Sequence, residues 1–194
     1  MADFHPIKLE GDWNIGYALD LHVISSEFIG YNEFGHPQFD TKRTILGELL
    51  HKLKYKSDKS VLNDILRILN NFKKFRSIDV IIPVPPSNTS RRFQPVIEIA
   101  NRLGDSLGIQ VLPNAVRKVK DTPELKNMST FEEKCGLLQD AFEIRDSSIS
   151  GKTILLFDDL YQTGATLTAI TRILYKKGKV SKVIVLTLTK TKRR

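Results

Sequence analysis

The chain has 194 residues, which is enough for one α/β domain with an additional subdomain. Its hydrophobic content of 41% and charged content of 27% are those of a globular protein, and its formal net charge of +8 fits a phosphate-rich partner or an ordinary basic surface. The single cysteine, Cys135, excludes an intrachain disulfide and a cysteine-rich zinc site. The sequence begins without a basic, apolar leader and has no apolar run of membrane-spanning length, so we expect a cytoplasmic protein with no membrane partner.

The first part of the chain predicts a cap made of strands followed by two helices. Apolar side chains alternate along residues 13–23, which is typical of a strand with one covered face, and residues 26–31 are a candidate hairpin partner. Residues 32–40 predict a loop. Two helical patterns follow, one opened by Thr41 with basic side chains near its end, and one beginning near Asp58. The four histidines lack the spacing of a metal site, so we assign them no chemistry.

A buried strand beyond the cap ends in a polar loop. Residues 78–86, Ile-Asp-Val-Ile-Ile-Pro-Val-Pro-Pro, predict a strand that prolines terminate, and residues 95–107 predict a helix with proline in its first turn. Ser87, Arg91 and Arg92 lie in the loop between them, where they are candidates to bind an anion. A plain solvated loop is the alternative interpretation.

A polar segment later in the chain predicts a mobile loop. Residues 117–127 are mostly charged or polar and cannot form a core, so we expect them to close over a site and shield it from water. Lys118 and Lys120 are its candidate phosphate contacts, and a solvated loop is again the competing interpretation. Residues 129–133 resemble a capping box that starts a short helix, and residues 141–144 predict a short strand.

The most informative stretch is a strand that runs into two acids. The apolar run 154–157 stops at Asp158 and Asp159, and a Thr-Gly-Ala-Thr turn then precedes a helix over residues 165–177. Residues 183–188 predict a final buried strand. Continuous apolar residues suit a strand buried in a parallel sheet, and such a strand delivers the residues after it to the carboxyl edge, where open α/β folds bind ligands.

The residues of this turn point to a phosphorylated sugar. Gly164 allows close approach of the backbone, and the hydroxyls of Thr163 and Thr166 join the free amides of the helix start in an anion site. The carboxylates of Asp158 and Asp159 repel a phosphate, so their natural partners are sugar hydroxyls or Mg²⁺. The alternatives are acids that only cap the next helix, or a phospho-acceptor aspartate of the receiver type.

Residues 153–167 resemble the binding signature of the type I phosphoribosyltransferases. The resemblance implies that Asp158 and Asp159 are the catalytic acids, which hold the ribose hydroxyls of phosphoribosyl pyrophosphate (PRPP) and Mg²⁺, directly or through water. It also implies that the turn cradles the 5-phosphate and that the basic loops meet the pyrophosphate. The implied PRPP-binding residues are Thr163, Gly164, Ala165, Thr166, Ser87, Arg91, Arg92, Lys118 and Lys120.

The order of motifs from Ile78 to Lys190 looks most like the ComF/GntX branch of that family, which is associated with natural competence and DNA uptake. Members of the branch typically carry an N-terminal cysteine zinc ribbon, which this chain lacks, so the competence role does not follow from the resemblance. The implied fold is a doubly wound, mostly parallel α/β sheet of the type I phosphoribosyltransferase kind. We expect an N-terminal strand-plus-helix cap in residues 1–76 and the phosphoribosyltransferase-like domain in residues 77–194.

The implied activity is transfer of the 5-phosphoribosyl group from PRPP to a nitrogenous base, with release of pyrophosphate. No pattern in the cap or in the turn identifies the acceptor base. The alternative is a non-catalytic protein that binds PRPP or a nucleotide, or a ComF-like accessory of DNA uptake. Binding of single-stranded nucleic acid and formation of a homodimer both stay open.

Overall fold

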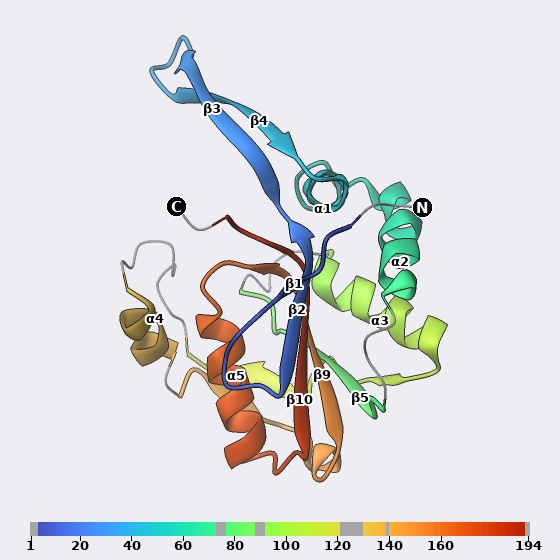
Figure 1. The fold of residues 1–194 in the computed structure, drawn as a ribbon. Helices are drawn as coiled ribbons and strands as arrows, with labels where there is room; N and C mark the ends of the chain where they lie inside the picture. Colours follow the sequence, from blue (N-terminus) through green and yellow to red (C-terminus); the bar gives the residue numbers. More distant parts are fainter. Residues whose placement is uncertain (1–3, 73–76, 88–91, 121–129, 139, 193–194) are drawn as a thin grey trace.

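A computed structural model of the chain describes residues 4–72, 77–87, 92–120, 130–138 and 140–192 (Figure 1). Its centre is a six-stranded sheet in the order β1-β2-β10-β9-β5-β6, in which every neighbouring pair is parallel except β1 with β2. The strands of this sheet are β1 (Ile7–Lys8), β2 (Ile15–Leu21), β5 (Val80–Pro83), β6 (Gln110–Val111), β9 (Thr153–Tyr161) and β10 (Lys182–Lys190). The predicted mostly parallel α/β fold is confirmed.

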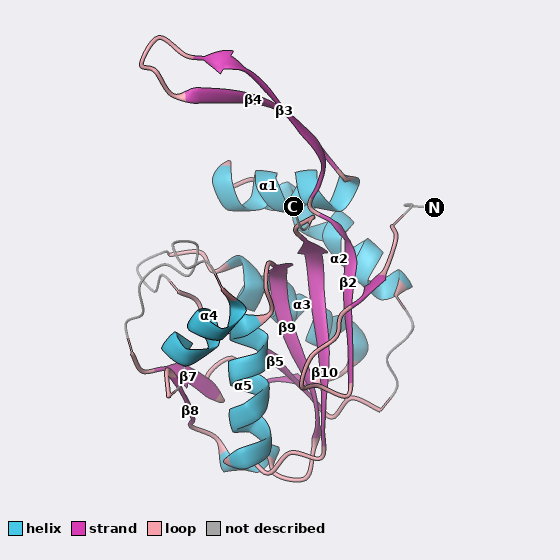
Figure 2. Ribbon diagram, turned by 60° about the vertical axis from the view of Figure 1, so that its left-hand side comes forward, coloured by secondary structure: helices cyan, strands magenta, loops and turns pink. Residues whose placement is uncertain are grey.

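Helices cover both faces of the sheet (Figures 1 and 2). One face packs against α1 (Ile45–Tyr55), α2 (Leu62–Asn71) and α3 (Pro95–Leu107), with the 3₁₀ turn Lys59–Val61 before α2. The other face packs against α5 (Ala165–Lys176), and beside α5 lie α4 (Phe131–Leu138), the 3₁₀ turn Ser147–Ile149 and a small antiparallel pair, β7 (Val116–Lys118) with β8 (Phe142–Ile144). The sheet is therefore doubly wound.

Strand β9 serves both cores because successive side chains point to opposite faces. Ile154 and Leu156 pack in the cluster on the α5 face, while Leu155 and Phe157 pack in the cluster on the α1–α3 face. All four side chains are at most 1% exposed. This alternation fixes the directions of the acids that come next in the chain.

The strand does not stop at Phe157, where its apolar run ends. It continues to Tyr161 because β10 stays paired with it as far as Lys190. On its other side, β5 ends at Pro83, opposite Phe157, and the amide of Val84 donates the last backbone hydrogen bond to the Phe157 carbonyl (2.8 Å). Beyond that point β9 has a neighbour on one side only, which leaves a notch at the carboxyl edge of the sheet.

The N-terminal region differs from the expected cap. Strand β2 is parallel to β10 in the main sheet, and it has both faces covered: Ala18 packs in one core cluster and Leu19 in the other. The prediction of one covered face was therefore wrong. The division into residues 1–76 and 77–194 stays a prediction, although strands from both ranges share one sheet.

The predicted pairing of residues 26–31 was also wrong. Strand β3 (Val23–Tyr31) pairs with β4 (Pro37–Arg43), which occupies part of the predicted loop, and together they form a hairpin that projects from the body (Figure 2). Helix α1 then begins at Ile45 and not at Thr41, with the hydroxyl of Thr44 accepting a hydrogen bond from the Gly47 amide (3.0 Å). The hairpin stands in solvent, so its strands lack the apolar alternation of a covered strand.

Other local predictions are confirmed. Helix α3 has the predicted bounds and ends at Gly108, whose φ of 66° is left-handed. Thr130 and Glu133 form a reciprocal capping box before α4, with both hydrogen bonds at 3.1 Å. The prediction of a mobile loop was wrong for residues 117 and 118, which belong to strand β7, and residues 121–127 of that segment lie outside the described part. Among the described helices, none is long and apolar enough to cross a membrane.

Candidate functional site

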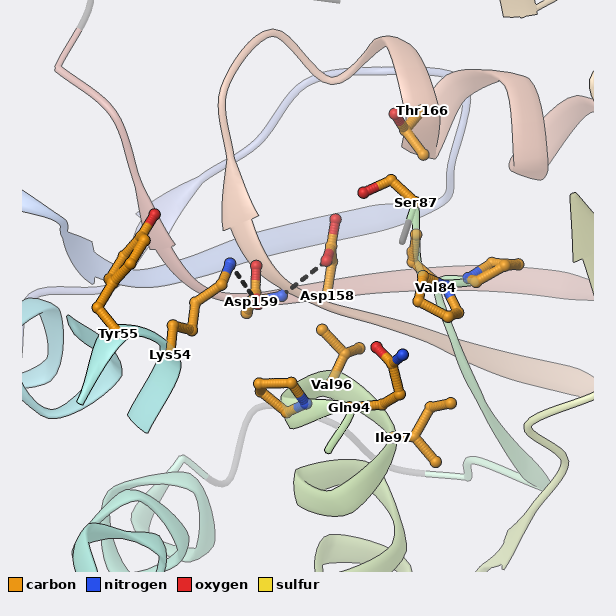
Figure 3. Close-up of a pocket in the computed structure, with 13 residues that line it drawn as sticks. Lys54, Tyr55, Val84, Ser87, Gln94, Val96, Ile97, Asp158, Asp159 and Thr166 are labelled. Atoms are coloured by element: carbon orange, nitrogen blue, oxygen red, sulfur yellow. Dashed lines mark hydrogen bonds and ion pairs between the residues drawn. The ribbon is translucent and has the colours of Figure 1, made fainter. Parts of the chain in front are cut away.

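The notch beside β9 holds a cavity of about 320 Å³ (Figure 3). Four elements besides β9 line it: the loop after β5, the last turn of α1 and the first turns of α3 and α5. The lining residues are Lys54, Tyr55, Val84, Pro85, Pro86, Ser87, Gln94, Pro95, Val96, Ile97, Asp158, Asp159 and Thr166. Both acids of the central motif therefore face a cavity at the carboxyl edge of the sheet, as the strand pattern predicted.

A second cavity of about 210 Å³ adjoins the first on the side of α5. Its lining residues are Lys54, Lys134, Asp158, Asp159, Leu160, Gln162, Thr163, Gly164, Ala165, Thr166 and Leu167. Four residues belong to both cavities: Lys54, Asp158, Asp159 and Thr166. The acid pair thus lies where the two cavities meet, and one extended ligand can occupy both.

The two acids have different partners. Asp159 lies on the same face of β9 as Leu155 and Phe157. Its Oδ2 forms an ion pair with Nζ of Lys54 from α1 at 2.8 Å. Asp158 lies on the opposite face of β9, and its Oδ1 accepts a hydrogen bond from the Asp159 amide (2.8 Å). In Figure 3 the carboxylate of Asp158 lies on the side of Ser87 and Thr166, whereas that of Asp159 lies beside Lys54.

Burial, together with the neighbouring charge of Asp159, raises the pKa of Asp158 from an ordinary value of 3.8 to about 8. The hydrogen bond from the Asp159 amide and the charge of Lys54 act in the opposite direction, but they do not offset the burial. The ligand-free site therefore favours a neutral Asp158 at neutral pH. A cation or a hydroxyl donor beside this carboxyl would favour its charged form.

The turn between β9 and α5 has the backbone of an anion site. Gly164 is the N-cap of α5 with a φ of 84°, and a Cβ added there would lie 2.7 Å from the Tyr161 hydroxyl. The amide of Ala165 donates only a long hydrogen bond (3.5 Å) to the hydroxyl of Thr163. The first amides of α5 and two threonine hydroxyls therefore line the second cavity, where a phosphate would find several donors.

The structure brings most of the predicted site residues together. Those that line one or both cavities are Ser87, Asp158, Asp159, Thr163, Gly164, Ala165 and Thr166. Arg92, Lys118 and Lys120 line neither cavity, and Lys118 instead pairs with Phe142 in the small sheet. Arg91 lies outside the described residues. The assignments of these side chains to PRPP stay predictions.

Sequence reasoning missed the contribution of α1. Lys54 is one of several basic residues near the end of this helix, and nothing local separates it from Lys52 or Lys56. Its contact with Asp159 joins residues far apart in the sequence. Gln94 and Val96, at the start of α3, were missed for the same reason, since only the packing of α3 beside β9 turns them toward the cavity.

The acid pair fits Mg²⁺ as a partial ligand set. Among the described residues, no three His, Cys, Asp or Glu side chains cluster as a metal site would require. Mg²⁺ is commonly held by only one or two carboxylates, together with waters and substrate phosphates, so a protein cage is not needed. Asp158 is the better candidate of the two, because Asp159 is already paired with Lys54.

Comparison with known proteins agrees with the motif. No protein-family model matches the chain. The chain is 27% identical over 154 residues to competence protein ComFC of Bacillus subtilis (strain 168), a match that covers 78% of this chain and 62% of ComFC. The chain thus spans about three fifths of the length of that curated relative.

Solved structures with a similar arrangement include an adenine phosphoribosyltransferase and a UMP synthase. Adenine phosphoribosyltransferase from Thermoanaerobacter pseudethanolicus superposes with a TM-score of 0.48 at 20% identity, over 84% of this chain and 83% of that one. UMP synthase from Leishmania donovani superposes with a TM-score of 0.41 at 16% identity, over 83% of this chain and 28% of that one. The ComFC match and the motif at residues 153–167 both support a similarity to the type I phosphoribosyltransferases and to their ComF-like branch.

Proposed function

We propose that the chain binds PRPP with Mg²⁺ and transfers its 5-phosphoribosyl group to a nitrogenous base, releasing pyrophosphate. One observation carries this proposal: the acid pair stands where two cavities meet, one lined by the Thr-Gly-Ala-Thr turn and the other by the loop after β5. PRPP is a sugar with a phosphate at one end and a pyrophosphate at the other. The turn and the loop would donate hydrogen bonds to these two groups, and the carboxylates between them would accept hydrogen bonds from the sugar hydroxyls.

Each part of the ligand has a candidate partner. The 5-phosphate fits the second cavity, which Gly164 and the first turn of α5 line. The ribose hydroxyls lie beside Asp158 and Asp159, which accept hydrogen bonds. The pyrophosphate extends into the first cavity toward Ser87. The remaining wall of that cavity, which includes Tyr55 and Val96, offers an apolar surface for a flat acceptor base.

The chemistry is a substitution at the anomeric carbon of the sugar. The bond from that carbon to the pyrophosphate oxygen breaks, pyrophosphate leaves with the electron pair, and the lone pair of a base nitrogen forms the new bond while the nitrogen loses its proton. The sugar ring becomes positively charged at the transition state, and the adjacent carboxylates favour that charge. Bound Mg²⁺ would neutralise charge on the departing pyrophosphate.

Lys54 balances the pair of carboxylates in this scheme. Two bare carboxylates on adjacent residues would repel each other, and the ion pair with Lys54 compensates one of them. Asp159 is largely buried, with 7% of its surface exposed, so Lys54 is the cation that offsets the loss of contact with water. We assign Asp159 to holding the ribose and Lys54 to positioning Asp159.

Calorimetric titration of PRPP, with and without Mg²⁺, tests the proposal. We expect saturable binding to the native chain and its loss in Asp158→Asn/Asp159→Asn. Asp146→Asn, at the half-buried N-cap of a distant 3₁₀ turn, is the matched control and should bind as the native chain does. Pyrophosphate release during a screen of purine and pyrimidine bases would establish the transfer itself. Absence of PRPP binding by the folded native chain would refute the proposal.

A second candidate is a non-catalytic accessory of DNA handling. The name of the curated relative, competence protein ComFC, and the formal net charge of +8 favour it. This candidate predicts binding of single-stranded DNA that weakens steeply with salt and does not respond to PRPP. Fluorescence anisotropy of single-stranded DNA at several salt concentrations distinguishes this candidate from the enzyme. The enzyme should bind PRPP at each of these salt concentrations.

A further inference from the structure

Strand β10 changes from apolar to polar side chains at the level where β9 reaches its acids. The α5 face of β10 carries Val183 and Val185, which pack in the core cluster on that side, and then Thr187. Thr187 pairs with Asp158 in the parallel register, as Val185 pairs with Leu156. Since side chains alternate between the two faces of each strand, Thr187 and Asp158 point to the same face and lie side by side on neighbouring strands about 4.8 Å apart.

The hydroxyl of Thr187 is buried without a hydrogen-bond partner. The residue is 0% exposed, and its Oγ1 forms no hydrogen bond with any atom of the residues that the structure describes. On its β2 side Thr187 pairs with Ala18, which has no polar side-chain atom, so Asp158 is the paired neighbour whose side chain can accept a hydrogen bond. A hydroxyl buried without a hydrogen bond destabilises a protein relative to an apolar side chain of the same shape, so the fold alone gives no reason for a threonine here.

A second threonine on the same strand shows the contrast. Thr189 is also 0% exposed, but its hydroxyl donates to the Asp159 carbonyl (3.3 Å) and lies 3.1 Å from Nδ1 of His22. The hydroxyl of Thr189 therefore links β10 to the neighbouring backbone and contributes to the fold. The hydroxyl of Thr187 makes no such link, which leaves it available to a different orientation of the Asp158 side chain.

The carboxyl of Asp158 lies between the cavities and this hydroxyl. Asp158 lines both cavities, whereas Thr187 lines neither and lies in the buried layer between β10 and α5. We propose, building on the proposed function, that Thr187 is a positioning residue: its hydroxyl donates a hydrogen bond to the Asp158 carboxylate when PRPP is bound. A fixed donor behind a carboxylate restricts its orientations, so this bond would hold the Asp158 carboxylate toward the ribose and Mg²⁺.

Two substitutions of Thr187 test this role by calorimetric titration of PRPP with Mg²⁺ and by thermal unfolding. Thr187→Val keeps the shape of the side chain and removes the hydroxyl. Its thermal midpoint should rise by about 2–4 °C, and its affinity for PRPP should fall about tenfold or more. Thr187→Ser keeps the hydroxyl and removes a buried methyl group. Its thermal midpoint should fall by about 2–4 °C, while its affinity stays within about twofold of the native value.

Thr171→Val is the matched control. Thr171 lies on α5, is 0% exposed, and likewise has a hydroxyl without a hydrogen-bond partner among the described residues. It lines neither cavity. Thr171→Val should therefore raise the thermal midpoint as Thr187→Val does, but it should leave the affinity for PRPP unchanged.

The outcomes separate this role from the proposed function. Unchanged PRPP affinity in Thr187→Val, or equal losses of affinity in Thr187→Val and Thr187→Ser, would overturn the positioning role and leave the proposed function standing. A lower thermal midpoint in Thr187→Val would also overturn it, because the hydroxyl would then stabilise the fold itself. Absence of PRPP binding by the folded native chain would overturn both proposals.

Discussion

The two sides of β9 at its carboxyl end balance charge in different ways. On the α1 side, Asp159 has a lysine at 2.8 Å and is part of the framework of the body. On the α5 side, Asp158 has an amide as its hydrogen-bond donor within the described part of the chain, and burial raises its pKa to about 8. The same residue type on one strand thus has two environments: Lys54 compensates the charge of Asp159, whereas the carboxyl of Asp158 accepts a hydrogen bond from a backbone amide.

The largest effect is expected from removing the lysine. Lys54→Met leaves a largely buried carboxylate without its cation, so the free energy of unfolding should fall by about 2–3 kcal/mol. Denaturant unfolding measures this. Lys52→Met, two residues away on the same helix, is the control and should cost less than about 0.5 kcal/mol. Equal losses in the two variants would show that the Lys54–Asp159 pair does not stabilise the fold.

A smaller effect is expected in the turn on the α5 side. Gly164→Ala places a Cβ 2.7 Å from the Tyr161 hydroxyl at a left-handed φ of 84°, so stability should fall by about 1–2 kcal/mol. Gly136→Ala in α4 meets nothing within 4 Å and should instead stabilise the chain by about 0.5–1 kcal/mol. Thermal unfolding of the two variants should therefore shift in opposite directions. A neutral Gly164→Ala would show that the turn relaxes easily.

The raised pKa of Asp158 predicts a pH dependence. Folding favours the protonated carboxyl, so the stability that this group contributes is complete below about pH 4 and is lost as the pH rises toward 8. Asp158→Asn has no carboxyl to titrate, so its free energy of unfolding should not fall in this way. When the pH rises from 5 to 9, the stability of the variant should increase by at least about 1 kcal/mol relative to that of the native chain. Chemical unfolding of both proteins at the two pH values measures the difference. Parallel pH profiles would place the carboxyl in an ordinary environment.

The smallest effect belongs to the loop after β5 and depends on the proposed function. Ser87→Ala removes one neutral donor from the first cavity, so the affinity for PRPP should fall about two- to fivefold, consistent with a single hydrogen bond. Calorimetric titration in the presence of Mg²⁺ measures this. Ser148→Ala, in the distant 3₁₀ turn, should leave the affinity unchanged.

Local patterns in the sequence were enough to predict the central strand, the bounds of α3 and the gathering of the acids and the turn at one sheet edge. These features depend on short runs of apolar residues, on caps and on glycine, which act over a few residues. The ion pair of Lys54 was not predictable, because it depends on how α1 docks beside β9. The β3–β4 hairpin was not predictable either, since a strand that covers no core has no apolar alternation to detect.

The unequal lengths of β5 and β9 have a consequence for how such a site can be altered. Strand β5 has 4 residues and β9 has 9, and the overhang beyond Phe157 runs from Asp158 to Tyr161, about 13 Å at the usual rise per residue. Inserting or deleting residues between Pro85 and Ser87, which line the first cavity and belong to neither core cluster, would resize the notch. Selection, or a designer, can thus adapt this fold to larger or smaller ligands at one loop while the folding of the sheet is left untouched.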